Sequence, residues 1–161
     1  MIVAGCALLW LAWPQIVRPD TEPGTSAKPA TGLVAGEILS IQGIEWPRDR
    51  DTLVMFLQSS CKFCTASMEF YRSLLQTGSN VQLVVVGREP LPALLEYLTF
   101  HKFKPERVQF LEKPIPGVTG TPILILVDSS GRVRDSWRGQ MDGSQEARLR
   151  QLMTTAPLDS R

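Results

Sequence analysis

The sequence predicts an α/β domain in which helices flank a central mixed β-sheet. Short runs of apolar residues, typical of buried strands, alternate with stretches whose apolar residues recur every three or four positions, as in amphipathic helices. The chain has 161 residues, which is enough for one globular domain and too few for two with independent cores. Apolar residues make up 43% and charged residues 20% of the chain, so a core is available.

The first half of this domain contains a strand, a helix and a second strand. Residues 52–57 (TLVMFL) are mostly apolar, which indicates a buried central strand. Residues 61–75 have the periodicity of an amphipathic helix, which is expected to end near Gly78. Residues 81–86 (VQLVVV) form the next buried strand.

The remaining elements are separated by segments rich in proline and glycine. They are a helix at about 91–103, a short strand at 107–111, a strand at 123–127, a half-exposed strand at 132–137 that forms an antiparallel hairpin with it, and a helix at 144–153. Ser144 is the candidate N-cap of the last helix. Residues 33–46 are expected to add one or two edge strands.

An uncharged apolar segment occupies residues 1–17. Its length is near the lower limit of the about 17–25 residues that cross a bilayer as a helix, and Pro14 weakens its second half. Three interpretations fit it: an uncleaved membrane anchor, the apolar region of a cleaved signal peptide, or a buried helix of the domain. The run Val3-Ala4-Gly5-Cys6 also resembles a lipoprotein cleavage box, in which Cys6 would carry lipid.

A segment of different composition separates the apolar N-terminus from the domain. Nine of the fourteen residues from Pro19 to Gly32 are Pro, Gly, Ser or Thr, and such a composition cannot bury enough apolar surface to order itself. We therefore expect a flexible linker at 18–33, the folded domain at 34–155 and a tail at 156–161.

Two cysteines open the first expected helix, in the sequence Cys61-Lys62-Phe63-Cys64. Their spacing lets the thiols close and reopen a small disulfide with little backbone movement. A thiol at the start of a helix has a lowered pKa, because unpaired N–H groups and the helix dipole favour its thiolate. Cys61 is therefore the expected nucleophile toward a substrate disulfide, and Cys64 is the expected resolving thiol. Lys62 would stabilise the thiolate further, and Phe63 would form an apolar rim.

Other roles for the cysteine pair are less well supported. Zinc would need two more ligands, and the chain offers only His101 and the remote Cys6, so no metal is expected. A structural disulfide remains an alternative, although closing a three-residue loop removes little chain entropy. The net charge of +1 gives no electrostatic case for a nucleic-acid partner, and no nucleotide fingerprint points to a cofactor.

This order of signals resembles the thioredoxin fold, and more narrowly the membrane-tethered TlpA/ResA-type thiol–disulfide oxidoreductases. The resemblance covers about residues 34–155 and depends on the cysteine pair and on the Gly120-Thr121-Pro122 loop before the strand at 123–127. It implies that the Thr121–Pro122 peptide is cis and that the exposed backbone beside it binds an extended substrate segment. The helix and strand at about 91–111 resemble the αβ insertion that this branch has before the cis-proline strand.

Several positions depart from that family. Met55 stands where thioredoxin has a buried acid that assists proton transfer to the resolving cysteine. Glu69 could accept that proton if it were buried, although an exposed helix carboxylate is the simpler interpretation. The Lys-Phe pair between the cysteines is also atypical, so the redox potential cannot be transferred. The loop at 112–119 is too short for the helix that usually precedes the cis-proline.

The resemblance implies a thiol–disulfide oxidoreductase that acts on cysteines of exported proteins, for instance in cytochrome c or other cofactor maturation. Its expected partners are protein thiols or disulfides and a membrane or periplasmic electron donor or acceptor. The N-terminal segment would hold the domain on the extracytoplasmic, periplasmic side of the membrane, or the protein would be secreted if that segment is cleaved. The alternative is a redoxin-fold binding or assembly protein with a structural or regulatory disulfide and no turnover.

Overall fold

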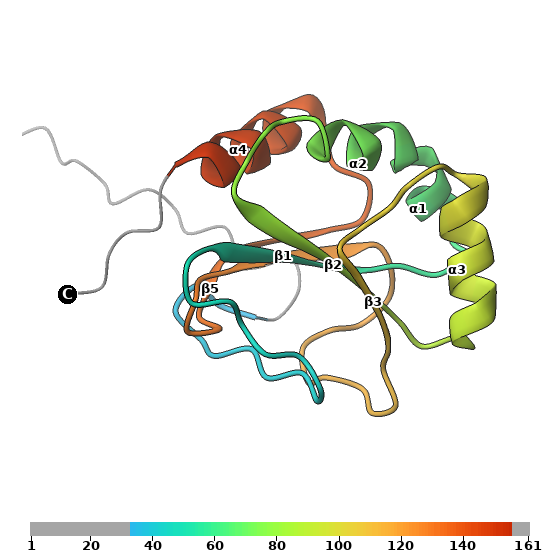
Figure 1. Cartoon of the computed structure of the whole chain (residues 1–161), viewed down its shortest axis with the longest axis horizontal. Coiled ribbons are helices and arrows are strands. Elements are labelled where there is room, and N and C mark those ends of the chain that lie inside the picture. Colours follow the sequence, from blue (N-terminus) through green and yellow to red (C-terminus); the bar gives the residue numbers. More distant parts are fainter. Residues whose placement is uncertain (1–32, 156–161) are drawn as a thin grey trace, which may run out of the picture.

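The computed structural model describes residues 33–155, so the expected membrane segment, nearly all of the linker and the tail lie outside the described residues. Five strands form one mixed sheet in the order β3-β2-β1-β4-β5 (Figure 1). The strands are β1 (Asp51–Phe56), β2 (Val81–Gly87), β3 (Arg107–Phe110), β4 (Ile123–Val127) and β5 (Val133–Arg138). The helices are α1 (Lys62–Ala66), α2 (Met68–Leu74), α3 (Leu91–Phe100) and α4 (Gly143–Thr154). The expected α/β architecture is confirmed.

The central strand is β1, and all six of its residues are buried. It pairs in parallel with β2 and in antiparallel with β4, so that Met55 lies between Val85 and Leu124. Because both faces of this strand are covered, its apolar residues run continuously and do not alternate with polar ones. Because β1 is the central strand, the loop that carries the cysteines begins at the middle of one end of the sheet.

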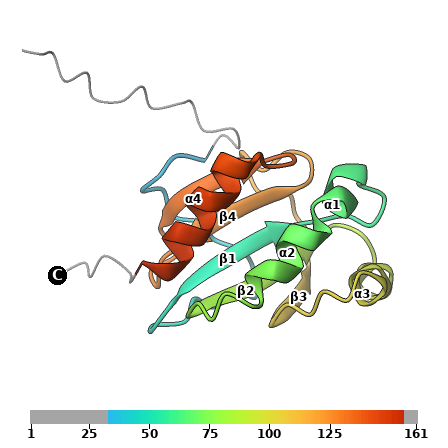
Figure 2. The same cartoon turned by 90° about the horizontal axis from the view of Figure 1, so that it is seen from above.

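One face of the sheet is covered by α1, α2 and α4, while α3 stands beside α1 at one end of the molecule (Figures 1 and 2). Leu53, Met55 and Leu57 point to this face, because alternate residues of a strand share a side. They belong to a buried apolar cluster that also contains Cys64 of α1 and Tyr71 of α2. We call this group the helix-side cluster.

The opposite face carries no helix within residues 33–155. Two segments without regular structure cover it, residues 33–48 and residues 111–121, and both run along the lower side of the sheet in Figure 1. Val54 and Phe56 point to this face and pack in a second apolar cluster with side chains of these segments. The edge strands expected at 33–46 are wrong, because this stretch makes only an isolated bridge between Ile38 and Arg132.

Two details of the helices also differ from the expectations. The helix expected over 61–75 is divided at Ser67, whose N–H is shared between the carbonyls of Phe63 and Cys64, a tightening that is common where a helix ends. The N-cap of α4 is Asp142 and not Ser144. The Asp142 carboxylate accepts from two N–H groups of the first turn, and the Gln145 side chain accepts from the Asp142 N–H, which completes a capping box.

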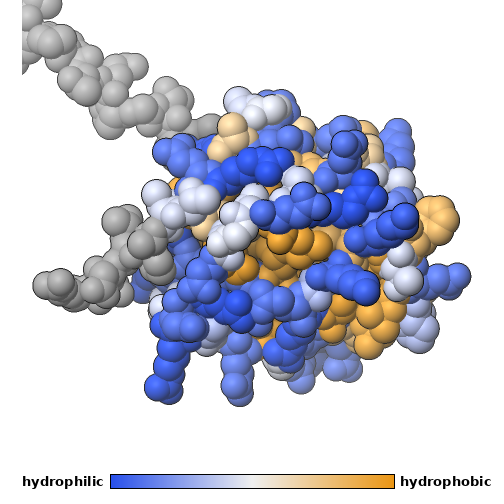
Figure 3. Space-filling model, turned by 45° about the horizontal axis from the view of Figure 1, so that its top comes forward, coloured by the Kyte–Doolittle hydropathy of each residue, from blue (hydrophilic) through white to orange (hydrophobic). Residues whose placement is uncertain are grey.

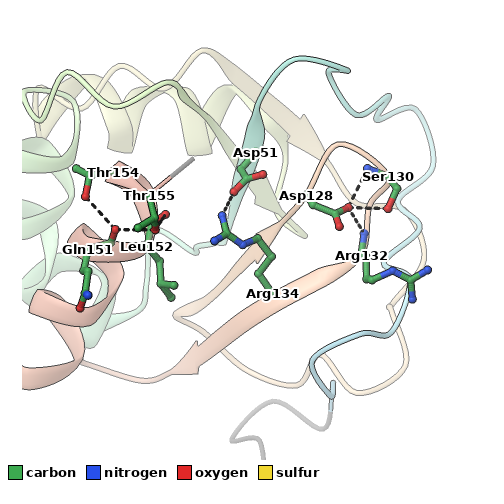
Figure 4. Close-up of polar contacts among 9 residues, drawn as sticks. All are labelled: Asp51, Asp128, Ser130, Arg132, Arg134, Gln151, Leu152, Thr154 and Thr155. Carbon is green, nitrogen blue, oxygen red and sulfur yellow. Dashed lines mark hydrogen bonds and ion pairs between the residues drawn. The ribbon is translucent and has the colours of Figure 1, made fainter. Parts of the chain in front are cut away.

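Polar contacts gather at the sheet end opposite the cysteines. Asp51 is only 2% exposed and accepts a hydrogen bond from Arg134, which joins β1 to β5 (Figure 4). Nearby, Asp128 closes the turn between β4 and β5 by accepting from the N–H groups of Ser130 and Arg132 (Figure 4). These contacts fix the hairpin whose first strand begins at the cysteine site.

Apolar side chains reach the surface at the end of the molecule that carries α1 and α3 (Figure 3). The most exposed of them in these two helices are Phe63, Leu95 and Phe100. None of the helices within residues 33–155 is both long enough and apolar enough to cross a membrane.

Candidate active site

Cys61 and Cys64 lie where β1 passes into α1. Cys61 is the N-cap of α1 and has an extended backbone, and its sulfur accepts a hydrogen bond from the backbone N–H of Cys64 at 3.2 Å. Cys61 is partly exposed, whereas Cys64 is fully buried in the helix-side cluster. Both cysteines are free thiols. The pair therefore has one thiol that a substrate can reach and one that it cannot.

The residues just before β4 lie against Cys61. The Cys61 thiol donates a hydrogen bond to the carbonyl oxygen of Thr121 at 3.4 Å, although the two residues are 60 positions apart in the chain. The Thr121–Pro122 peptide is cis, as the resemblance implied. The ladders that pair β4 with its neighbours begin at Ile123, so Thr121 lies just beyond the paired part of the strand.

The two thiols have opposite acid–base properties. Burial acts to raise the pKa of Cys61, but hydrogen bonds from the Cys64 thiol, from the Thr121 side chain and from backbone N–H groups of α1 outweigh it, and the pKa is lowered. Burial, followed by the hydrogen bond with Cys61, raises the pKa of Cys64 to about 12. A thiolate therefore forms at Cys61 first.

The two residues between the cysteines lie at the surface of the molecule. Lys62 places its ammonium over the Phe63 ring, 4.9 Å from the ring centroid, and both side chains are exposed. The pKa of Cys61 is lowered chiefly by hydrogen bonds and not by the charge of Lys62. The Phe63 side chain is 46% exposed.

Within residues 33–155, Asp51 is the only buried carboxylate, and it lies at the start of β1, whereas the cysteines follow the end of that strand. Met55, at the strand position where thioredoxin has a buried acid, is fully buried. Glu69 is exposed in the first turn of α2, where it borders a shallow depression with Ser73 and Arg150, so it does not meet the condition of burial. Within residues 33–155, no three His, Cys, Asp or Glu side chains converge in a way that could hold a metal ion.

Solved structures resemble this arrangement, whereas no family model and no curated protein matches the chain. A thiol-disulfide isomerase from Corynebacterium glutamicum superposes with a TM-score of 0.58 at 20% identity over 74% of this chain and 97% of its own. The thioredoxin domain of a thiol-disulfide oxidoreductase from Bacteroides vulgatus gives 0.57 at 16% identity, over 76% and 99%. A thiol:disulfide interchange protein from Bacteroides sp. gives 0.58 at 18%, over 80% and 96%.

The chain has a thioredoxin-like fold. At identities of 16–20%, the similarity establishes the fold and not the activity.

The sequence did not predict two polar contacts near the cysteine pair. The Glu89 carboxylate, which follows β2, accepts from the backbone N–H of Ser59 at 2.7 Å and from its hydroxyl at 2.5 Å, just before the cysteine pair. The Tyr97 hydroxyl of α3 lies 3.1 Å from the Thr65 hydroxyl of α1. Both contacts join segments about 30 positions apart, and no local signal indicates them.

A pocket opens beside Thr121 on the face of the sheet that bears no helix. Its volume is about 710 Å³, and its lining runs from the ends of β1 and β2 to the loop at 114–121. Phe56, Val86 and Leu111 form its apolar wall. The sequence predicted that the loop before the cis-proline is too short for a helix, and no helix is present there. The sequence did not indicate that a pocket would form beside this loop.

Proposed function

We propose that this chain is a thiol–disulfide oxidoreductase in which Cys61 is the nucleophile and Cys64 the resolving thiol. The observation that carries the proposal is the asymmetry of the pair. The thiol with the lowered pKa is accessible, and the thiol whose pKa is raised to about 12 is buried behind it. The solved structures of similar fold are named as thiol–disulfide isomerases and interchange proteins, which supports the same chemistry.

In the reductive direction, the Cys61 thiolate attacks one sulfur of a substrate disulfide. A mixed disulfide forms, and the other substrate sulfur leaves as a thiolate that takes a proton from solvent. Cys64 then loses its proton and attacks the Cys61 sulfur, which releases the second substrate thiol and closes the Cys61–Cys64 disulfide. The substrate gains two electrons and the cysteine pair loses two. An external dithiol must then reduce the pair again.

Residues around the pair have supporting roles in this proposal. Thr121 and Pro122 present the backbone beside which an extended substrate segment binds as an added strand. Phe63 supplies apolar contact at the rim, and Lys62 acts through its contact with Phe63. Glu69 receives no role in proton transfer because it is exposed.

The cellular setting is part of the same proposal. The apolar N-terminus anchors the domain at a membrane, the domain faces the extracytoplasmic side, and the substrates are cysteines of exported proteins. Maturation of c-type cytochromes or of other cofactor proteins fits such a reductant, with a membrane or periplasmic electron donor as its partner. Topology mapping with a reporter fused after Arg161 tests this arrangement, because a cytoplasmic reporter would contradict it.

Reduction of insulin disulfides by the full chain tests the chemistry. Wild type and Cys6→Ser should both catalyse it with dithiothreitol as the donor, whereas Cys61→Ser should be inactive. Cys64→Ser should accumulate mixed disulfides, whose mass identifies the trapped partner. If wild type proves as inactive as Cys61→Ser, the redox proposal is wrong, and a binding or assembly protein with a non-catalytic cysteine pair becomes the better description.

A further inference from the structure

The pocket beside Thr121 lies on the side of the sheet opposite the cysteines. Cys61 packs against the helix-side cluster, whereas Phe56, Val86 and Leu111 of the pocket wall belong to the cluster on the other face. Thr121 belongs to both places, since it lines the pocket and its carbonyl accepts from the Cys61 thiol. A segment bound beside Thr121 therefore meets the reactive sulfur on one side and the pocket on the other.

The alternation of side chains along a strand decides which substrate residues face the pocket. Successive side chains of an extended segment point to opposite faces of the sheet that it joins. A substrate cysteine that points to Cys61 on the helix side must therefore place its two immediate neighbours on the opposite side. That is the side on which the 710 Å³ pocket opens.

The lining defines the chemistry of the group that fits. Ile115 and Val118 of the loop are half-buried and pack against the apolar cluster beneath them, and the prolines around Ile115 add further apolar surface. Arg88 is the single charged residue of the lining, and it forms no ion pair with any residue of the described range 33–155. An apolar side chain with a carboxylate close to it complements this pocket.

We propose that the substrates are extended polypeptide segments in which a bulky apolar residue directly adjoins the reactive cysteine and an acidic residue lies nearby. The apolar side chain enters the pocket, and Arg88 attracts the carboxylate. This inference rests on the proposed redox function and adds the substrate class to it. It assigns the pocket wall as the determinant of specificity, separate from the cysteines that carry the reaction.

The test uses peptides whose single cysteine is joined in a mixed disulfide to nitrothiobenzoate. The Cys61 thiolate of the reduced full chain attacks the peptide sulfur, the coloured nitrothiobenzoate leaves as a thiolate, and Cys64 then releases the peptide thiol. One peptide has leucine on both sides of the cysteine and a glutamate beyond. A second has serine in place of leucine, and a third has glutamine in place of glutamate. The symmetrical nitrobenzoate disulfide, which has no peptide, reports the reactivity of Cys61 alone.

The leucine peptide should react about tenfold faster than the serine peptide, as expected when one buried aliphatic side chain is discriminated. Val118→Asn and Ile115→Asn should each abolish most of this preference without changing the rate with the small disulfide. The matched control Val34→Asn, an exposed valine on the same face, should retain it. Arg88→Gln should abolish the preference for glutamate over glutamine, and salt should weaken that preference in wild type.

Equal rates for the leucine and serine peptides, with normal reduction of the small disulfide, would overturn the inference and leave the redox function intact. Loss of reaction with the small disulfide in wild type would overturn the redox function, and the substrate class with it. A preference that survives both loop substitutions would show that the selectivity arises elsewhere than in this pocket.

Discussion

Glu89 holds Ser59 through two hydrogen bonds, one from the serine backbone N–H at 2.7 Å and one from its hydroxyl at 2.5 Å. The two residues follow neighbouring parallel strands, β2 and β1, and both lie at the edge of the sheet where the cysteine site begins. Ser59 is two positions before Cys61. The carboxylate therefore ties the cysteine-bearing loop to the adjacent strand end.

Replacing this carboxylate should loosen the loop. Glu89→Gln keeps an acceptor for the Ser59 N–H, but it removes the charge, and its amide nitrogen can only donate to the Ser59 hydroxyl, which then has to turn round. Charged hydrogen bonds are the stronger ones, so we expect the free energy of unfolding to fall by about 1–2 kcal/mol. The rate at which Cys61 reacts should also decrease. Urea denaturation measures the first effect. Glu96→Gln, an exposed carboxylate on α3, is the control and should change stability by less than about 0.5 kcal/mol. Equal stabilities of the two variants would contradict the role of Glu89.

The two thiols should be alkylated in separate ranges of pH. Cys61 should react with iodoacetamide with a midpoint below that of an ordinary thiol, while Cys64 should stay unmodified until the pH approaches its pKa of about 12. Peptide mass spectrometry after timed labelling distinguishes the two sites. Thr121→Val, which keeps the shape of the side chain and removes its hydroxyl, should raise the midpoint for Cys61. Thr99→Val, on the exposed side of α3, should leave it unchanged.

Two buried tyrosines offer a matched pair of substitutions. The Tyr97 hydroxyl forms a hydrogen bond with the Thr65 hydroxyl. The Tyr71 hydroxyl has no hydrogen-bond partner within the described residues, although the Ser67 side chain lies near it. Tyr97→Phe should therefore lower the free energy of unfolding by about 1 kcal/mol, while Tyr71→Phe should leave it unchanged or raise it by up to about 1 kcal/mol. Thermal and urea denaturation of both variants check this order, and the reverse order would refute it.

Asp51 and Asp128 should respond to acid in opposite ways, although they lie near each other (Figure 4). Burial raises the pKa of Asp51 despite its bond to Arg134. At Asp128, hydrogen bonds led by that from Ser130 outweigh burial and lower the pKa. A raised folded-state pKa adds stability as the pH falls toward it, and a lowered one withdraws stability as the pH falls through it. Between pH 7 and pH 3, Asp51→Asn should therefore become more destabilising relative to wild type, and Asp128→Asn less so. Urea denaturation at several pH values measures both differences, and parallel pH dependences of the two variants would contradict this assignment.

The sequence by itself determined the parts of this protein that are encoded locally. The apolar runs of β1, β2 and β4 predict central strands because residues buried on both faces must all be apolar. Two short motifs point to the fold, namely the spacing of Cys61 and Cys64 and the place of Pro122 before a strand. Both can be recognised in the sequence because each spans only a few neighbouring residues. Even the missing helix before β4 follows from a loop that is too short to contain one.

Only the tertiary structure decided how these parts meet. The first helix is divided at Ser67 by a shared backbone hydrogen bond that the apolar periodicity does not indicate. Either Asp142 or Ser144 could have capped α4, and the structure shows that Asp142 does. The contact of Glu89 with Ser59 and the pocket that links Thr121 to Arg88 join segments distant in the chain. Hydrophobic periodicity records which face of an element is buried, but it carries no information about which distant side chain will lie against it. The sheet order brings these residues together, so the surroundings of the cysteine pair became visible only in three dimensions.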